Sequence, residues 1–392
     1  MLASLVQRGL QTRAGTARQS PDDAMGRCGN AALAGALLAL CVAAILSLCA
    51  ILDYTRPAPP VPAAPSSTAA TSPDLLSGVL GLRLRLLLDS APCGQATAAL
   101  LAVVSHAGHV AARSAARRAC PSSQLAASGA RRVFLLAVPR PADPDHVSPQ
   151  ALADEARRFG DLVQADFAEA YRNLSYKHAL GLAWAARRCP LARLVLKMDD
   201  DVAADLPGLL ALLLARDPPP PLQGYLLAGR RPERDPRSKW CVTRAEYPPE
   251  QYPAFLSGWL YAATPRVAAE LVRRAARLPF FWVDDVLLTG LARRAAGVRL
   301  EDVRDLRGLF ASHAELLQCC LASTRYQCDF MVGPDGGQPE MLVKFQRHAD
   351  RCRRLRCPRR PQNESLRRTC VVRRSSAPPE RGHALVRPVQ LR

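Results

Sequence analysis

The chain has 392 residues, of which 49% are hydrophobic, 5% aromatic and 22% charged. This is enough apolar material for a sizeable core, which excludes a wholly disordered chain, and the length excludes a small disulfide-stapled scaffold. The formal net charge is +19, and residues 347–392 contribute +11 of it, from 14 Arg against three acidic residues. A basic excess concentrated in a tail, and not on a motif, argues against a nucleic-acid partner.

The N-terminal segment has the composition of a membrane anchor. Residues 31–52 are uncharged and rich in Ala and Leu, and a helix of this length spans the bilayer core of about 30 Å. Four Arg precede it, so the positive-inside rule predicts a cytosolic tail over 1–30 and a luminal remainder. The alternative is a cleaved signal peptide, whose apolar region is only about 7–15 residues long. The Pro-, Ala-, Ser- and Thr-rich residues 53–79 predict a stem.

Predicted strands and helices alternate along the rest of the chain. In chain order we expect a strand at 80–88, a strand at 100–105, a helix at 110–119, a strand at 132–138, a helix at 149–159, a strand at 162–164, a helix at 175–189, a strand at 193–198, a helix at 207–216, a strand at 256–263 and helices at 266–277 and 286–295. These assignments rest on apolar runs and helical periodicity. The alternation predicts an α/β fold, with a sheet covered on both faces.

Ten cysteines follow the predicted anchor. An even number in an oxidising lumen predicts disulfides, but the sequence leaves their pairing open. The sequons at Asn173 and Asn363 predict N-glycosylation. For the Arg-rich extension over 347–392 three interpretations stay open: disorder, binding of acidic glycans, or a lineage-specific addition.

Two groups of acidic residues stand out. The apolar run 194–198 leads directly into Asp199, Asp200 and Asp201. Ligands of open α/β sheets bind beyond the carboxyl ends of the strands, and carboxylates suit a hard divalent cation that neutralises a diphosphate leaving group. A solvated acidic turn is the alternative. Asp284 and Asp285 precede a predicted helix, where acidic side chains also simply favour helix initiation.

Several blocks together resemble one enzyme family. They include Phe159–Phe167, Tyr171–Lys177, Trp184, Cys189, Lys197–Val202, Glu246–Tyr261, Val283–Val286 with Gly290, and the Arg-rich helix Arg113–Arg117. In order and spacing these resemble the β-1,3-galactosyltransferase and β-1,3-N-acetylglucosaminyltransferase family, glycosyltransferase family 31, over residues 82–317. The resemblance implies a GT-A-type nucleotide-sugar-binding fold, a mixed central sheet flanked by helices, in a luminal domain spanning 80–346.

The resemblance also implies a manganese site. Asp201 is expected to ligate Mn²⁺ directly, while Asp199 and Asp200 serve the metal and the ribose of the donor. His313 lies where such enzymes supply a third metal ligand, although a lone His is more often exposed or satisfied in a core.

On the donor side, Arg113 and Arg117 match the family's early Arg-rich helix and are expected to face the diphosphate, with an exposed basic helix face as the alternative. Asp166 and Lys197 match donor-side positions. For Asp166 a fold-stabilising cap, and for Lys197 a structural ion pair, are the alternatives. Ala119-Cys120 stands where the family has Thr-Trp, and two interpretations stay open: a looser nucleotide side after loss of the aromatic, or a disulfide at Cys120.

On the acceptor side, Asp285 matches the position of the family's catalytic base. Asp284 stands where the family usually has Glu, which keeps the charge. Trp240 and Trp259 are candidates for stacking on acceptor sugars, and Trp259 departs from the small residue usual after the Ser-Gly pair.

Together these features predict a single-pass type II enzyme of the Golgi apparatus membrane, catalytic domain luminal. It is expected to transfer galactose from UDP-galactose, with inversion, to the 3-hydroxyl of an acceptor glycan on a glycoprotein or glycolipid. The alternatives are transfer of N-acetylglucosamine from UDP-GlcNAc, a catalytically inactive lectin-like member, and a polyanion-binding membrane protein that uses the basic tail.

Overall fold

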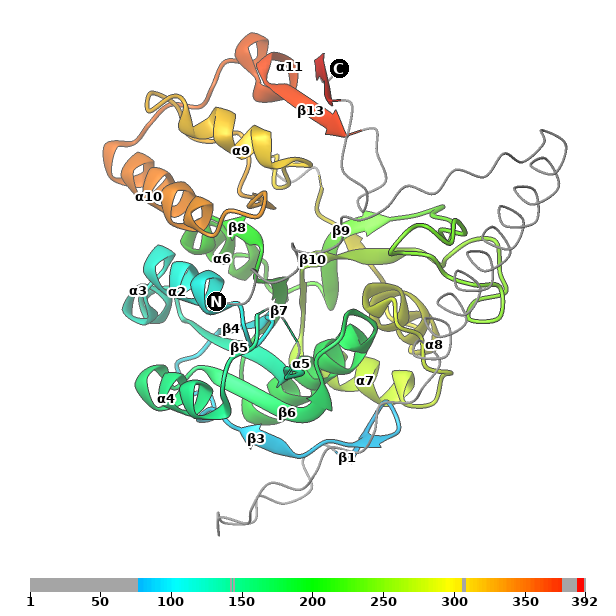
Figure 1. The fold of residues 1–392 in the computed structure, drawn as a ribbon. Coiled ribbons are helices and arrows are strands. Elements are labelled where there is room, and N and C mark those ends of the chain that lie inside the picture. The colour runs from blue at the N-terminus through cyan, green and yellow to red at the C-terminus, as the bar shows by residue number, and fades with distance from the viewer. Residues whose placement is uncertain (1–76, 142, 144, 305–307, 376–385, 391–392) are drawn as a thin grey trace, which may run out of the picture. The chain divides into compact units, whose positions relative to one another are not determined.

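The computed structural model describes residues 77–141, 143, 145–304, 308–375 and 386–390, all within one compact unit (Figure 1). The predicted cytosolic tail, the transmembrane anchor and most of the stem lie outside the described residues. Within these ranges, no helix combines the length and the apolar character that a membrane span requires.

A mixed sheet of eight strands forms the centre, in the order β11-β9-β10-β7-β4-β5-β6-β3. Four neighbouring strands, β7, β4, β5 and β6, are parallel. By contrast, β10 is antiparallel to both of its neighbours, and β3 to β6. The strands are β3 (Leu86–Leu88), β4 (Ala99–Val104), β5 (Ala130–Val138), β6 (Leu162–Ala168), β7 (Leu194–Asp199), β9 (Leu222–Leu227), β10 (Phe255–Ala263) and β11 (Glu301–Asp302).

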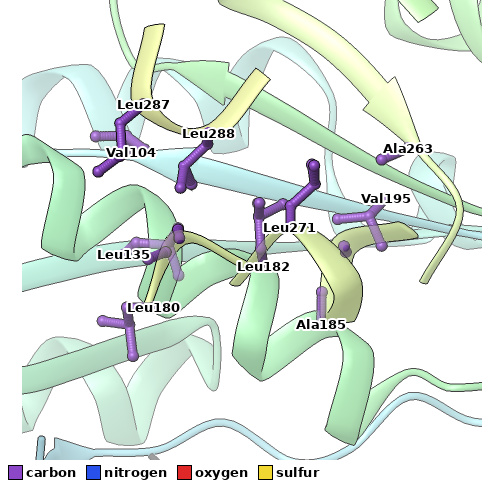
Figure 2. Close-up of a cluster of buried hydrophobic side chains, with 14 of the residues drawn as sticks. Val104, Leu135, Leu180, Leu182, Ala185, Val195, Ala263, Leu271, Leu287 and Leu288 are labelled. Atoms are coloured by element: carbon purple, nitrogen blue, oxygen red, sulfur yellow. The ribbon is translucent and has the colours of Figure 1, made fainter. Parts of the chain in front are cut away.

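Helices cover both faces of this sheet, as predicted. Along β4, Leu100 and Val104 belong to one buried cluster, while Leu101 and Val103 belong to another, because successive side chains of a strand point to opposite faces. The first cluster is completed by α5 (Leu174–Arg188), α7 (Pro265–Ala275) and the π-helix η3 (Val286–Ala292) (Figure 2). The second cluster is completed by α2 (Val110–Ala119), α3 (Ser122–Ala127), α4 (Pro149–Phe159) and α6 (Leu206–Leu214). The mixed α/β sheet flanked by helices is therefore confirmed.

The segment 80–88, predicted to be a short strand or the approach to one, contains two short strands, β2 (Leu82–Arg83) and β3. Leu80 and Gly81 have φ values of +50° and +83°, a left-handed conformation that ends a strand. This turn separates β2 from the preceding strand β1 (Ser77–Val79). Val79 is buried in the first cluster, so the last residues of the predicted stem belong to the folded unit.

The predicted boundary at 346, with a separate extension beyond it, is also wrong. It falls inside α10 (Glu340–Leu355), whose residues Phe345, His348 and Cys352 are buried. Apolar residues at helical spacing outweigh the many Arg of this segment, because they bury one face of the helix. In Figure 1, α10 lies beside α2 and β8. The remaining elements are β8 (Val202–Ala204), η2 (Tyr171–Asn173), α8 (Arg293–Ala295), α9 (Ala314–Leu321), β12 (Val332–Pro334), η4 (Gln362–Glu364), α11 (Leu366–Thr369), β13 (Val371–Ser375) and β14 (Val386–Gln390).

Disulfides stabilise this fold, as the even number of cysteines predicted. The pairs are Cys93–Cys189, Cys319–Cys370, Cys320–Cys328 and Cys352–Cys357. Among the described cysteines, Cys120 and Cys241 are free, so Cys120 does not join a disulfide.

Candidate functional site

The acidic triplet lies at the carboxyl edge of the parallel strands. Asp199 is the last residue of β7 and pairs in register with Val104, the last residue of β4. β10 is antiparallel to β7, with Leu260 opposite Met198, so Gly258 of β10 reaches the same edge. The start of η3 brings Asp285 to this place, because Gly258 donates its backbone N–H to Asp285 Oδ2 over 3.3 Å. Three chain-distant segments thus meet where the topology predicts a ligand site.

A single buried ammonium connects the two acidic groups. Lys197 Nζ lies 2.7 Å from Asp199 Oδ1, 2.6 Å from the carbonyl oxygen of Gly258 and 3.8 Å from Asp284 Oδ2. Its charge is compensated on both sides, which lets a lysine stay buried. The structure therefore brings the triplet and the acid pair together, and gives Lys197 the ion-pair role that was the alternative to donor contact.

Asp285 has the properties of a base that works near neutral pH. Burial, and next to it the negative charge of Asp284, raise the pKa of Asp285 to about 7. Lys197 and the backbone N–H groups of Val286 and Gly258 act in the opposite direction. A catalytic base is most effective when its pKa is close to the working pH.

The pKa of Asp284 is shifted in the opposite direction. Burial acts against its charge, but the ammonium of Lys197 and a hydrogen bond from His178 Nδ1, 2.9 Å from Asp284 Oδ2, lower the pKa of Asp284 below its ordinary value. Two adjacent carboxylates whose environments move their pKa values apart are typical of an active site.

The triplet itself carries excess negative charge. Burial raises the pKa of Asp199 to about 7 in spite of Lys197, and burial and Asp200 raise the pKa of Asp201. In Asp200 burial is outweighed by hydrogen bonds from His109 Nδ1 (2.9 Å) and Ser105 Oγ (2.7 Å), which lower its pKa. The side chain of Asp199 is still 32% exposed, so its oxygens are accessible to a ligand.

The carboxylates suit a hard divalent cation, because they supply oxygen ligands and a cation would relieve their mutual repulsion. The Nδ1 of His313 lies 2.8 Å from Ser312 Oγ. No three His, Cys, Asp or Glu side chains of the described segments gather as a metal-ligating group. The predicted set Asp199, Asp201 and His313 is therefore not assembled in this structure.

Asp335 is a neighbour of the triplet that the sequence did not single out. Its backbone N–H donates to the Asp201 carbonyl oxygen over 2.8 Å, and its side chain is buried. Burial, and then the charges of Asp201 and Asp200, raise the pKa of Asp335. The local sequence shows only a Gly- and Pro-rich turn at this position, so no pattern could have identified it.

The arginines of α2 are structural. The side chain of Arg113 is 0% exposed, and all five of its N–H donors are used by Glu155, Ser105 and the carbonyls of His106 and Ala107. Arg117 pairs with Glu155 and Asp161. This differs from both expectations, a diphosphate contact and an exposed basic face, because sequence charge does not reveal buried acidic partners on α4.

The other expected site residues also have defined places. Asp166 Oδ1 accepts from the backbone N–H of Arg85 over 2.8 Å on the edge strand pair β3–β6, which is the fold-stabilising role. Trp259 packs against the second core cluster. By contrast, Trp240 and Tyr171 are each 47% exposed.

The ring centre of Tyr171 lies 6.0 Å from that of Trp282, two residues before Asp284. Burial raises the pKa of Tyr171 to about 12. The Lys239 ammonium lies 5.8 Å from the Tyr171 ring centre and 4.7 Å from that of Trp240. These three side chains form a cationic aromatic patch beside the acidic site.

The two sequons differ in their environment. Asn363 is exposed in η4. Asn173 is half-buried, and its Nδ2 donates to the Ala168 carbonyl oxygen over 2.8 Å. Glycosylation at either site stays a prediction.

Comparison with known proteins identifies a family match within the described unit. Residues 111–304 match the family model described as Galactosyltransferase. The chain is 31% identical over 205 residues to Beta-1,3-galactosyltransferase 5 of Homo sapiens, covering 52% of this chain and 64% of the relative. It is 35% identical over 209 residues to Acetylgalactosaminyl-O-glycosyl-glycoprotein beta-1,3-N-acetylglucosaminyltransferase of Homo sapiens, covering 52% and 54%.

The matched segments thus span less than two thirds of these relatives. The apo structure of the bifunctional glycosyltransferase WbbM resembles the chain at a TM-score of 0.31 and 12% identity, over 59% of this chain and 41% of that one. From the family match and these relatives, residues 111–304 belong to the galactosyltransferase family, glycosyltransferase family 31, a family of β-1,3-glycosyltransferases.

Proposed function

We propose that the described unit is a GT-A-type domain that transfers galactose from UDP-galactose, with inversion, to the 3-hydroxyl of an acceptor glycan, forming a β-1,3 linkage. The observation that carries this proposal is the pairing of Asp199 with Asp284 through one buried ammonium, Lys197, while Asp285 is held beside them by the backbone N–H of Gly258. This places a carboxylate of raised pKa next to a cluster suited to a cation and a diphosphate.

The proposed reaction needs one base. Asp285 takes the proton of the acceptor 3-hydroxyl while that oxygen attacks the anomeric carbon. The bond from the anomeric carbon to the diphosphate oxygen breaks, and its electron pair leaves with UDP. Because the sugar is transferred in one displacement, no covalent enzyme intermediate is required. Mn²⁺ held by Asp199 and Asp201 would supply charge neutralisation for the leaving diphosphate.

The acceptor sugar is proposed to lie on the cationic aromatic patch of Tyr171, Lys239 and Trp240. Aromatic rings offer an apolar face together with a polar edge, which suits a pyranose ring. Exposed rings close to Asp285 are better placed for this than Trp259, which packs on the core. The whole chain is proposed to be a single-pass type II protein of the Golgi membrane, acting on glycoprotein or glycolipid acceptors.

The test is an Asp285→Asn variant of the luminal part, residues 72–392, assayed with UDP-galactose and Mn²⁺ on simple β-linked acceptors. The variant should bind UDP normally, but its transfer rate should fall about a hundredfold or more. A hundredfold is the lower end of the range expected for loss of a general base. Asp154→Asn on α4, an exposed carboxylate, is the matched control and should transfer like the wild type. Retained turnover in Asp285→Asn would contradict the assignment of the base.

Transfer from UDP-GlcNAc is the second candidate, because one relative carries that activity in its name. A panel of UDP-sugars with linkage analysis of the product separates the two donors. Binding of glycans without transfer or hydrolysis of any UDP-sugar would instead favour the lectin-like alternative.

A further inference from the structure

His178 is a fully buried histidine on α5 whose two ring nitrogens both have partners. Its side chain is 0% exposed. Nδ1 lies 2.9 Å from Asp284 Oδ2, and Nε2 lies 2.5 Å from the Tyr261 hydroxyl. Tyr261 is itself buried on β10, opposite Lys197 of β7. These contacts form a continuous chain from Tyr261 through His178 to Asp284.

The direction of this chain follows from the chemistry of its members. Burial lowers the pKa of His178, so the ring is neutral and carries one N–H. A carboxylate can only accept, so the N–H is on Nδ1 and donates to Asp284. Nε2 is then an acceptor, and the Tyr261 hydroxyl donates to it. Each polar atom of the chain thus has a matching partner, as a buried network requires.

The chain ends on a residue whose neighbour is the proposed base. Asp284 is held from one side by His178 and from the other by Lys197. The charged groups that act on Asp285 are Asp284, which favours its protonated form, and Lys197, which opposes this. Tyr252 and Tyr171, on the facing segments, are neutral near pH 7 because the pKa of each is raised to about 12.

We propose that His178 and Tyr261 are positioning residues that hold Asp284 fixed beside Asp285, so that Asp284 serves the base and not the acceptor sugar. This rests on the function proposed above. The resemblance places Glu where this chain has Asp284, a side chain one methylene longer. With the shorter aspartate, His178 and Lys197 supply the contacts that keep the carboxylate in place.

The experiment compares His178→Phe with His178→Gln in the full luminal part. Phe keeps a ring but has no polar atom, whereas the amide of Gln can donate to Asp284 and accept from Tyr261. We expect His178→Phe to lower kcat at least tenfold with the KM for the UDP-sugar unchanged, and to move the acid limb of the pH–rate profile to lower pH. His178→Gln should stay within about threefold of the wild type.

Two further variants separate a specific role of His178 from a general loss of stability. His348→Phe removes a different buried imidazole, on α10, and should leave kcat and the acid limb unchanged even if it lowers the melting temperature. Tyr261→Phe removes only the hydroxyl and decides the matter if His178→Phe fails to fold.

An unchanged kcat and acid limb in a folded His178→Phe or Tyr261→Phe would overturn the positioning role while leaving the proposed function intact. Absence of transfer by the wild type would overturn the proposed function itself, and the positioning role with it.

Discussion

The charge of Asp284 should be visible in the pH dependence of transfer. With the pKa of Asp285 at about 7, kcat/KM of the wild type should fall about tenfold per pH unit below neutrality, since only ionised Asp285 accepts the proton. An aspartate of ordinary pKa would stay fully ionised down to about pH 5. Asp284→Asn removes the neighbouring charge and keeps the burial, so the acid limb should move to lower pH without reaching the ordinary value.

The size of this shift follows from simple electrostatics. At a separation of about 6 Å and an effective dielectric constant of about 20, one unit charge acts on another with about 3 kcal/mol, or about two pH units. Lys197 and solvent offset part of this, so we expect a shift of about one pH unit. The same change should lower the melting temperature, because it leaves Lys197 and His178 without the carboxylate that both contact.

The assay measures kcat/KM from pH 5 to 8.5 in the wild type and in Asp284→Asn. Asp199 also has a pKa of about 7 and is a second source of an acid limb. A limb caused by Asp199 should keep moving with Mn²⁺ concentration, because the cation competes directly with the proton, whereas a limb caused by Asp285 should stop moving once the cation site is saturated. A wild-type rate that is flat down to pH 5, or an identical limb in Asp284→Asn, would refute the reasoning.

Three further predictions concern the surroundings of this pair. Chelation by EDTA should abolish transfer and Mn²⁺ should restore it, and Asp201→Asn should raise the Mn²⁺ concentration needed for half activity, as measured by metal titration. Trp240→Ala should raise the acceptor KM about tenfold, equivalent to about 1.4 kcal/mol, without changing the KM for the UDP-sugar. Phe159→Ala, an equally exposed aromatic before β6, should not. Arg113→Met should lower the free energy of unfolding by about 3 kcal/mol or more, since Glu155 loses a buried partner. In the fraction that folds, the KM for the UDP-sugar should be unchanged. Thermal unfolding and steady-state kinetics measure the two effects.

The acidic triplet could be predicted because it is a local pattern. The apolar residues before Asp199 predict a buried strand, and the acidic residues mark the end of that strand. Because strands alternate with helices, the carboxyl end of this strand is predicted to lie at the ligand-binding edge of the sheet. The order of the parallel strands then follows from general rules of α/β folds. Nothing further along the chain is needed for this part of the site.

Buried polar contacts could not be predicted in the same way. The basic helix over 110–119 was found correctly, but whether Arg113 faces a diphosphate or a buried acid depends on α4, which comes about 40 residues later. The sequence gives no signal for His178, since its two partners come from β10 and from the residues just before η3. The apolar face of α10 was also missed. The Arg-rich composition of the C-terminal segment suggested an extension, and composition alone does not show that the apolar residues recur at helical spacing.

Lys197 and Gly258 connect the acidic triplet at Asp199 with the acid pair Asp284 and Asp285. The Gly258 carbonyl oxygen accepts from Lys197, and its N–H donates to Asp285, so one peptide segment of β10 touches both the cation and the base. Lys197 in turn contacts Asp199, where the donor is proposed to bind. A ligand that changes the charge at Asp199 would therefore change the net electrostatic field at Asp284 and Asp285. On the proposed function, binding of the donor is in this way linked to the basicity of the group that deprotonates the acceptor.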